Sequence, residues 1–225
     1  MTTELRRGFH DDIAALHERV YDLAVLVSEG ITDATVALLD GDVSLADAVV
    51  AADAQVDAVY SWVESEVFGL VARQAPVARD LRFLIATLRI AQSVERAGDL
   101  TASIARRTVR VDLGAMSQRV RALVLEMGSS AQAAFRAAAD CYAVLDAQGA
   151  AALPAADDHI DDLQRRLLHE LVASAPEADL VESVVDLALI ARFYERIGDH
   201  AVVVAERVRF VASGEMDASD RDEAT

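Results

Sequence analysis

Lysine is absent from this chain, cysteine occurs once, proline three times, and aromatic residues make up only 5% of the sequence. A single thiol cannot form an internal disulfide, so a fold held together by disulfides is excluded. Sequences with few prolines and aromatics but long runs of Ala, Val, Leu, Arg, Glu and Asp are typical of helical proteins. We therefore expect an all-α fold, with Cys141 as a small residue on a buried helix face.

Positive charge is also scarce, because 21 arginines stand against 38 acidic residues and the formal net charge is -17. Such a charge repels phosphate backbones and anionic lipid headgroups, so we expect no nucleic-acid binding. The chain has no uncharged apolar run of about 18 residues, which a membrane-spanning helix needs, and its first residues do not resemble a secretory signal. We expect a cytoplasmic protein that meets membranes only through its partners.

Helical periodicity with Gly, Pro and Asp as separators predicts six long helices. Their expected ranges are 4–40, 44–73, 76–112, 116–147, 155–173 and 176–214. Ser44, with Asp47 three residues later, predicts the cap of the second helix. The arginines of the third segment, including Arg96 and Arg107, fall on its solvent-facing side. The polar, acidic residues 215–225 are predicted to be a disordered tail.

The sequence contains an internal repeat. Its landmarks are "ERAGD" at 95–99 and "ERIGD" at 195–199, prolines at 76 and 176, and "ALLD" at 37–40 with "AVLD" at 143–146. Landmarks in the same order indicate a duplication, and three long helices joined by short loops pack most simply as an up-down-up bundle. We expect tandem three-helix bundles over 1–113 and 114–214.

The repeated motif places two carboxylates on the edge of the packing face in each half: Glu95 with Asp99, and Glu195 with Asp199. Carboxylates four residues apart repel one another, and if they are partly buried they must bind a proton or meet a cation. A glycine between them, Gly98 in the first copy, permits a neighbouring helix to approach closely.

The preceding helix of each half repeats the same spacing. Asp53 and Asp57 lie there in the first half, and Asp157 and Asp161 in the second. Four carboxylates without a local excess of His or Cys favour Mg²⁺, Mn²⁺ or a non-haem iron cluster over structural zinc. His159 and His200 could add nitrogen ligands in the second half.

Two other interpretations stay open at this stage. The same acids could form a carboxylate-bridged metal enzyme, although oxygen-activating bundles normally mix His with Glu and no catalytic grouping is visible. Alternatively, a metal-free helical scaffold could use these acids only in surface salt bridges, which contribute little individually. A single Glu-x-x-x-Asp on a helix usually belongs to a solvated face, but its repetition with the glycine favours a binding site.

Two segments resemble the motif helices of the PhoU family, the accessory regulators of the bacterial phosphate-specific transport system. They read "VARDLRFLIATLRIAQSVERAGD" at 77–99 and "DLALIARFYERIGDHAVVVAERV" at 186–208, and the resemblance extends over nearly the whole chain. It implies two three-helix repeats whose acidic pairs bind metal ions, Mg, Mn, Fe or Zn, often as clusters. The implied ligands are Asp53, Asp57, Glu95 and Asp99 in one half and Asp157, Asp161, Glu195 and Asp199 in the other.

One departure from the family pattern concerns the position two residues before each motif glutamate. Family members commonly carry Asp there, whereas this chain has Ser93 and Phe193, which reduces the number of ligands. The resemblance implies a non-enzymatic protein, commonly a homodimer. It would connect the ATPase subunit of the phosphate ABC transporter to a sensor histidine kinase and keep the phosphate-starvation response off when phosphate is plentiful.

Overall fold

The computed structural model describes residues 2–173 and 180–214. Its long helices are α1 (Thr2–Asp40), α2 (Val43–Gln74), α3 (Ala78–Ala105), α4 (Gln118–Val144), α6 (Leu153–Ala173) and α7 (Val181–Ser213). Shorter turns of helix are η1 (Thr108–Arg110), η2 (Leu113–Ala115) and α5 (Ala147–Ala150). The described ranges contain no strand, and the expected all-α fold with six long helices is confirmed.

Helix ends differ from the sequence-based expectation at several places. Asp42, not Ser44, caps α2, because its side chain accepts a hydrogen bond from the backbone N–H of Leu45 at 3.0 Å. The third helix ends at Ala105 instead of continuing to residue 112, and η1 and η2 follow it. A long-range contact holds this segment in place, since the Asp112 N–H donates to Ser183 Oγ on α7 at 3.1 Å.

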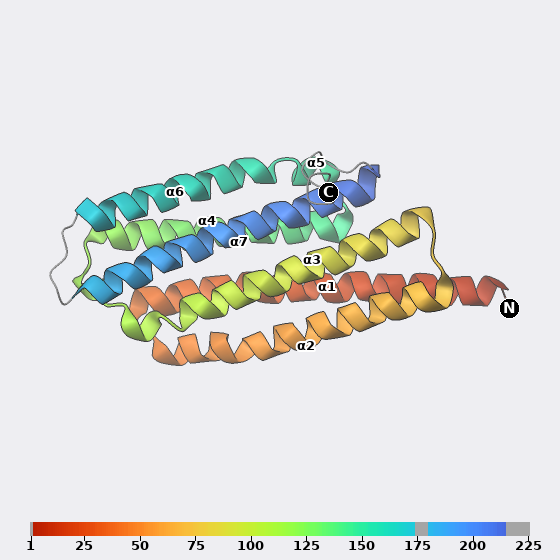
Figure 1. Cartoon of the computed structure of the whole chain (residues 1–225), viewed down its shortest axis with the longest axis horizontal. Coiled ribbons are helices and arrows are strands. Elements are labelled where there is room, and N and C mark those ends of the chain that lie inside the picture. The colour runs from red at the N-terminus through yellow and green to blue at the C-terminus, as the bar shows by residue number, and fades with distance from the viewer. Residues whose placement is uncertain (1, 174–179, 215–225) are drawn as a thin grey trace, which may run out of the picture.

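The two repeats lie side by side with their axes roughly aligned (Figure 1). α1 packs on α4 and α3 packs on α7 at the centre, while α2 and α6 lie at the outer edges. Each repeat is thus a three-helix bundle, and the repeats meet through two helix pairs. None of the helices in the described ranges is long and apolar enough to cross a membrane.

The core runs through both repeats as one cluster of buried side chains. In α2, four buried residues follow one another at intervals of seven positions and form one apolar face: Val49, Val56, Val63 and Leu70. Tyr194 is fully buried, and its hydroxyl lies 2.8 Å from Thr35 Oγ1 in the other repeat. Cys141 is buried, as expected. The boundary between 113 and 114 stays a prediction, and the expected tail at 215–225 lies outside the described residues.

Candidate metal centres

The first acid group consists of Asp53, Asp57, Glu95 and Asp99, on the facing sides of α2 and α3. One oxygen from each of Asp53, Asp57 and Asp99 lies within 4.8 Å of the other two. Within the described ranges, no other set of three possible ligands converges as closely. The structure therefore brings together the residues that were paired from their spacing, although their role as ligands stays a prediction.

Asp53 is the most enclosed member of the converging set. Its side chain is 14% exposed, and Oδ2 accepts a hydrogen bond from Arg106 Nη2 at 3.1 Å. Its other oxygen, Oδ1, is buried without a hydrogen-bond partner. Burial raises the pKa of Asp53, Arg106 lowers it, and the charges of Asp99 and Asp57 raise it again. A buried carboxylate oxygen beside two further carboxylates is suited to a cation.

Glu95 lies one turn before Asp99 on α3 and is half-buried. Burial raises its pKa, followed by the charge of Asp99, with smaller effects of the same sign from Asp57 and Asp53. Arg96 acts in the opposite direction, with its Nε 3.6 Å from Glu95 Oε2. The charges of all three aspartates thus raise the pKa of Glu95, and its carboxylate can serve as a fourth oxygen donor.

Gly98 permits the close approach of α2 that the motif predicts. A Cβ atom at this position would lie 3.1 Å from Val56 Cγ1, which is tighter than an ordinary side-chain contact. Val56 lies between Asp53 and Asp57 and is buried, so the contact at Gly98 brings both aspartates toward α3. A glycine within a helix costs about 1 kcal/mol relative to alanine, and here it shortens the distance between the two acid-bearing helices.

The second acid group consists of Asp157, Asp161, Glu195 and Asp199, on α6 and α7. Burial and, after it, the charges of Asp199, Asp161 and Asp158 together raise the pKa of Asp157 to about 6. Asp157 Oδ1 is buried without a hydrogen-bond partner. The carboxylate lies against Gly198, where an added Cβ would be 2.5 Å from Oδ1.

Glu195 is more deeply buried than its counterpart in the first group, with 8% of its surface exposed. Arg192 Nη1 donates to Oε1, whereas Oε2 is buried without a hydrogen-bond partner. Burial raises the pKa of Glu195 and also that of Asp199. The two groups therefore share a position in the repeat but differ in packing.

Neither histidine that could have supplied a nitrogen ligand is observed in contact with these acids. His159 Nε2 lies 3.9 Å from Glu126 Oε1 on α4. Burial and, after it, the charges of Arg196 and Arg96 together lower the pKa of His200 to about 4. Burial is thus the main reason that the His200 ring stays neutral, and the charges that act on it are those of two arginines.

Sequence reasoning missed Arg106, which follows the last residue of α3 and contacts the first acid group. A signal was available, because Arg106 lies seven residues after Asp99 and such residues share a helix face. Arg107, expected on the wet side, instead has its Nε 3.2 Å from Oδ1 of Asp186, which is 1% exposed. That contact joins residues far apart in the sequence, and periodicity within one helix carries no information about it.

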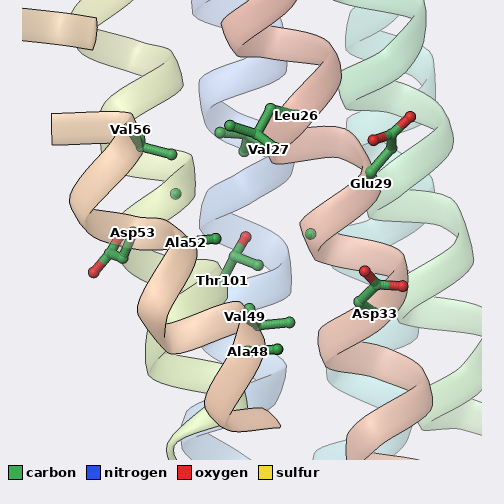
Figure 2. A pocket seen from close by; sticks show the side chains of 12 residues that line it. Leu26, Val27, Glu29, Asp33, Ala48, Val49, Ala52, Asp53, Val56 and Thr101 are labelled. Atoms are coloured by element: carbon green, nitrogen blue, oxygen red, sulfur yellow. The ribbon is translucent and has the colours of Figure 1, made fainter. Parts of the chain in front are cut away.

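A cavity of about 160 Å³ opens between α1 and α2, and Asp53 is among the residues that line it. Its walls include apolar residues of both helices, and Gly98 and Thr101 of α3 also line it. Figure 2 shows Val27 and Val49 pointing into the space between α1 and α2, while the carboxylate of Asp53 points away from it. The cavity is thus lined mainly by apolar side chains, with Glu29 and Asp33 on its α1 side, and the Asp53 carboxylate is directed away from it.

All the donors in both groups are carboxylate oxygens, the ligands that hard divalent cations prefer. Asp53, Asp57 and Asp99 fit such an ion best, because their oxygens already converge and one buried oxygen of Asp53 has no hydrogen-bond partner. The second group offers the same residue types with two buried oxygens of this kind, on Asp157 and Glu195. The residues present therefore fit a metal in both halves, with the first half closer to a binding geometry.

Comparison with known proteins identifies the same repeat. The PhoU domain model matches residues 20–108 and again residues 124–208. The chain is 35% identical over 213 residues to the phosphate-specific transport system accessory protein PhoU homolog 2 of Mycobacterium tuberculosis, covering 93% of this chain and 99% of the relative. It is 30% identical over 223 residues to the PhoU homolog of Caulobacter vibrioides, covering 98% and 96%.

Solved structures agree with the family match. The crystal structure of PhoU from Pseudomonas aeruginosa superposes with a TM-score of 0.87 at 29% identity, covering 92% of this chain and all of that one. PhoU from Streptococcus pneumoniae has the same fold, with a TM-score of 0.85 at 22% identity over 93% of this chain and 99% of its own. With the family model matched in both repeats and curated relatives matched over almost their full length, the chain belongs to the PhoU family.

Proposed function

We propose that this chain is a non-enzymatic accessory protein of the phosphate-specific transport system. It restrains the phosphate ABC transporter and keeps the phosphate-starvation two-component response off while phosphate is plentiful. The observation that carries this proposal is the match of the PhoU domain model to both repeats. The names of the relatives, which refer to the phosphate-specific transport system, support it.

The proposed partners are the ATPase subunit of the transporter and the sensor histidine kinase of the phosphate response, both reached from the cytoplasmic side. A net charge of -17 suits contacts with basic surfaces on other proteins. Six long helices present extended, rigid faces for helix-on-helix docking. We also propose that the protein acts as a homodimer, as is common in the family.

We propose that metal ions bind at both acid groups and act as structural or regulatory ligands. The convergence of Asp53, Asp57 and Asp99 within 4.8 Å supports this for the first repeat. The bound ion, whether Mg, Mn, Fe or Zn, would add positive charge to a group of three carboxylates, of which Asp57 is exposed and Asp53 and Asp99 are partly buried. The side chains would hold it through their oxygens and keep α2 and α3 together, so bound metal should stabilise the folded state.

The functional proposal is tested by deleting the gene in its host and measuring a reporter driven by a phosphate-starvation promoter. In phosphate-rich medium the deletion should switch the reporter on, and the wild-type gene should switch it off again. Any second copy of the gene must be deleted as well. A reporter that stays silent in phosphate-rich medium after every copy is removed would show that this chain does not repress the response.

The alternative of a carboxylate-bridged metal enzyme requires an open coordination position that faces a pocket. The cavity beside α2 does not supply one, because the Asp53 carboxylate points away from it (Figure 2). This arrangement favours a binding role for the metal. Hydrolysis of a generic phosphoester in the presence of Mn²⁺, lost on mutation of Asp53, would instead support the enzyme.

A further inference from the structure

Arg106 places a cation of the chain itself on the first acid group. Its Nη2 atom lies 3.1 Å from Asp53 Oδ2, and it reaches Asp53 from the C-terminal end of α3 across to α2. Asp53 is one of the three residues whose oxygens converge. A metal ion bound to that carboxylate would lie close to the guanidinium, and the two positive charges would repel each other.

The next residue, Arg107, is fixed to the other repeat. Its Nε atom lies 3.2 Å from Asp186 Oδ1 on α7, and its guanidinium carbon lies 4.7 Å from the ring centroid of Phe193. Arg110 Nε is 3.1 Å from Asp186 Oδ2. Asp186 is fully buried, so this contact is part of the packing between the repeats. Two consecutive arginines therefore have different partners: Arg106 pairs with the first acid group, and Arg107 pairs with Asp186 where the repeats meet.

The second acid group lacks this arrangement. Glu206 stands one hundred residues after Arg106, where the duplication would place the equivalent arginine. Asp157, the counterpart of Asp53, has no ion pair among the residues that the structure describes, and the charges acting on it are those of other acids. The two groups thus differ in whether the chain supplies a cation to the aspartate on the outer helix.

We infer that Arg106 is the cation that the first acid group holds without metal, and that a metal ion binding to Asp53, Asp57 and Asp99 displaces it. Because Arg107 is held by Asp186 and Phe193, displacement of Arg106 strains the segment that joins α3 to the second repeat. Occupancy of the first site is thereby transmitted to the contact between the repeats. Arg106 is a positioning residue in this scheme, and the inference rests on the proposed metal binding.

The affinity test isolates the first site. A parent protein carrying Asp157→Asn and Asp199→Asn, which disable the second group, is titrated calorimetrically with Mn²⁺ and, separately, with Zn²⁺. Arg106→Gln in this parent should bind about 1.5- to fivefold more tightly, the amount expected from removal of a competing ion pair. Arg106→Lys keeps the charge and should bind like the parent. Arg73→Gln is the matched control, because Arg73 forms a 3.0 Å ion pair with Glu66, away from the acids.

The transmission to the other repeat is tested by amide hydrogen exchange on the same proteins. Saturating metal should speed exchange of residues 106–112 and 181–187 in the parent and in Arg73→Gln, but not in Arg106→Gln, which has nothing to displace. Equal affinity of the parent and Arg106→Gln would overturn the inference while leaving metal binding intact, and so would exchange that metal does not alter in the parent. If no variant binds either metal, the inference and the proposed metal function both fall.

Discussion

Asp157 Oδ1 lies beside Gly198 at a place that leaves no room for a side chain: a Cβ on Gly198 would be 2.5 Å from it. In the first repeat the corresponding glycine, Gly98, is approached by Val56 Cγ1, at 3.1 Å from such a Cβ. An apolar side chain faces the glycine in both repeats, since a Cβ on Gly198 would also be 2.9 Å from Ile160 Cδ1, but only the second repeat adds a carboxylate. This difference explains why the two acid groups have different packing despite their common motif.

Replacing Gly198 by alanine should displace the Asp157 carboxylate and weaken metal binding at the second group by about tenfold or more, the range found when groups that orient metal ligands are removed. Stability without metal should change little, because the gain of about 1 kcal/mol from alanine in a helix offsets the displacement of the carboxylate and of Ile160 Cδ1, which would be 2.9 Å from the new Cβ. Gly69→Ala is the control, since its Cβ would meet only the end of the Arg73 side chain. Mn²⁺ titration and thermal unfolding of both variants measure the two effects, and unchanged affinity in Gly198→Ala would exclude Asp157 as a ligand.

The raised pKa of Asp157, about 6 against 3.8 for the free group, makes the metal-free protein depend on pH. The folded state binds this proton more tightly than the unfolded state does, so its stabilising effect is full below about pH 4 and is lost as the pH rises through 6. Asp157→Asn should therefore be more stable than the wild type at pH 7, by up to about 3 kcal/mol, and should lose that advantage near pH 4. Urea unfolding of both proteins with a chelator, from pH 4 to 7.5, measures the difference. A difference that does not change with pH would refute this assignment.

His200 should show the opposite dependence, because burial lowers its pKa to about 4 from the usual 6.5. The folded state keeps this ring neutral, so the stability is fully present above pH 6.5 and is lost as the pH falls toward 4. The His200→Gln variant lacks this titrating group. Its free energy of unfolding relative to the wild type should therefore rise as the pH is lowered from 6.5 to 4. His159→Gln is the control, since His159 is exposed on α6. If both variants respond alike, burial of His200 is not the cause.

The ion pair at Asp186 is expected to hold the two repeats together. Asp186→Asn leaves Arg107 and Arg110 without their buried counter-charge and should cost about 3 kcal/mol of unfolding free energy. Asp162→Asn removes an exposed pair with Arg165 and should cost less than about 1 kcal/mol. Urea unfolding at pH 7 gives both values. Equal, small losses would mean that the buried pair contributes no more than a surface pair.

Sequence reasoning reached the helices and the pairing of the acid motifs because both depend on residues that are close in sequence or repeated. The period of buried residues in α2 and the spacing of Glu95 and Asp99 are local properties. The course of the chain after α3 was not predictable in this way, because it includes a hydrogen bond from the Asp112 N–H to Ser183 on α7. For the same reason, the burial of Arg107 against Asp186 depends on how the repeats meet.

The N-terminal cap of α2 is another feature that the sequence alone did not predict correctly. Ser44 and Asp42 both have side chains suited to a cap, and only the observed hydrogen bond from the Leu45 N–H decides between them. The contrast between the acid groups also lay beyond the motif, since Gly98 and Gly198 occupy the same motif position but face different atoms of the preceding helix. The sequence repeat therefore predicted that the two acid groups occupy equivalent positions, but the atoms packed around each group differ and could not be predicted from it.

The most direct test of the account is the metal content of the untagged protein, measured by mass spectrometry after incubation with Mn²⁺, Fe²⁺ and Zn²⁺ and removal of free metal. The wild type should retain metal, and the Asp99→Ala, Asp199→Ala double variant should lose most of it. A control double variant, Asp47→Ala with Asp162→Ala, changes two exposed aspartates outside both groups and should retain as much metal as the wild type. If the wild type and the Asp99→Ala, Asp199→Ala variant carry the same amount of metal, or none, then the repeated acid motif is structural and the metal centres proposed for this PhoU family member do not exist.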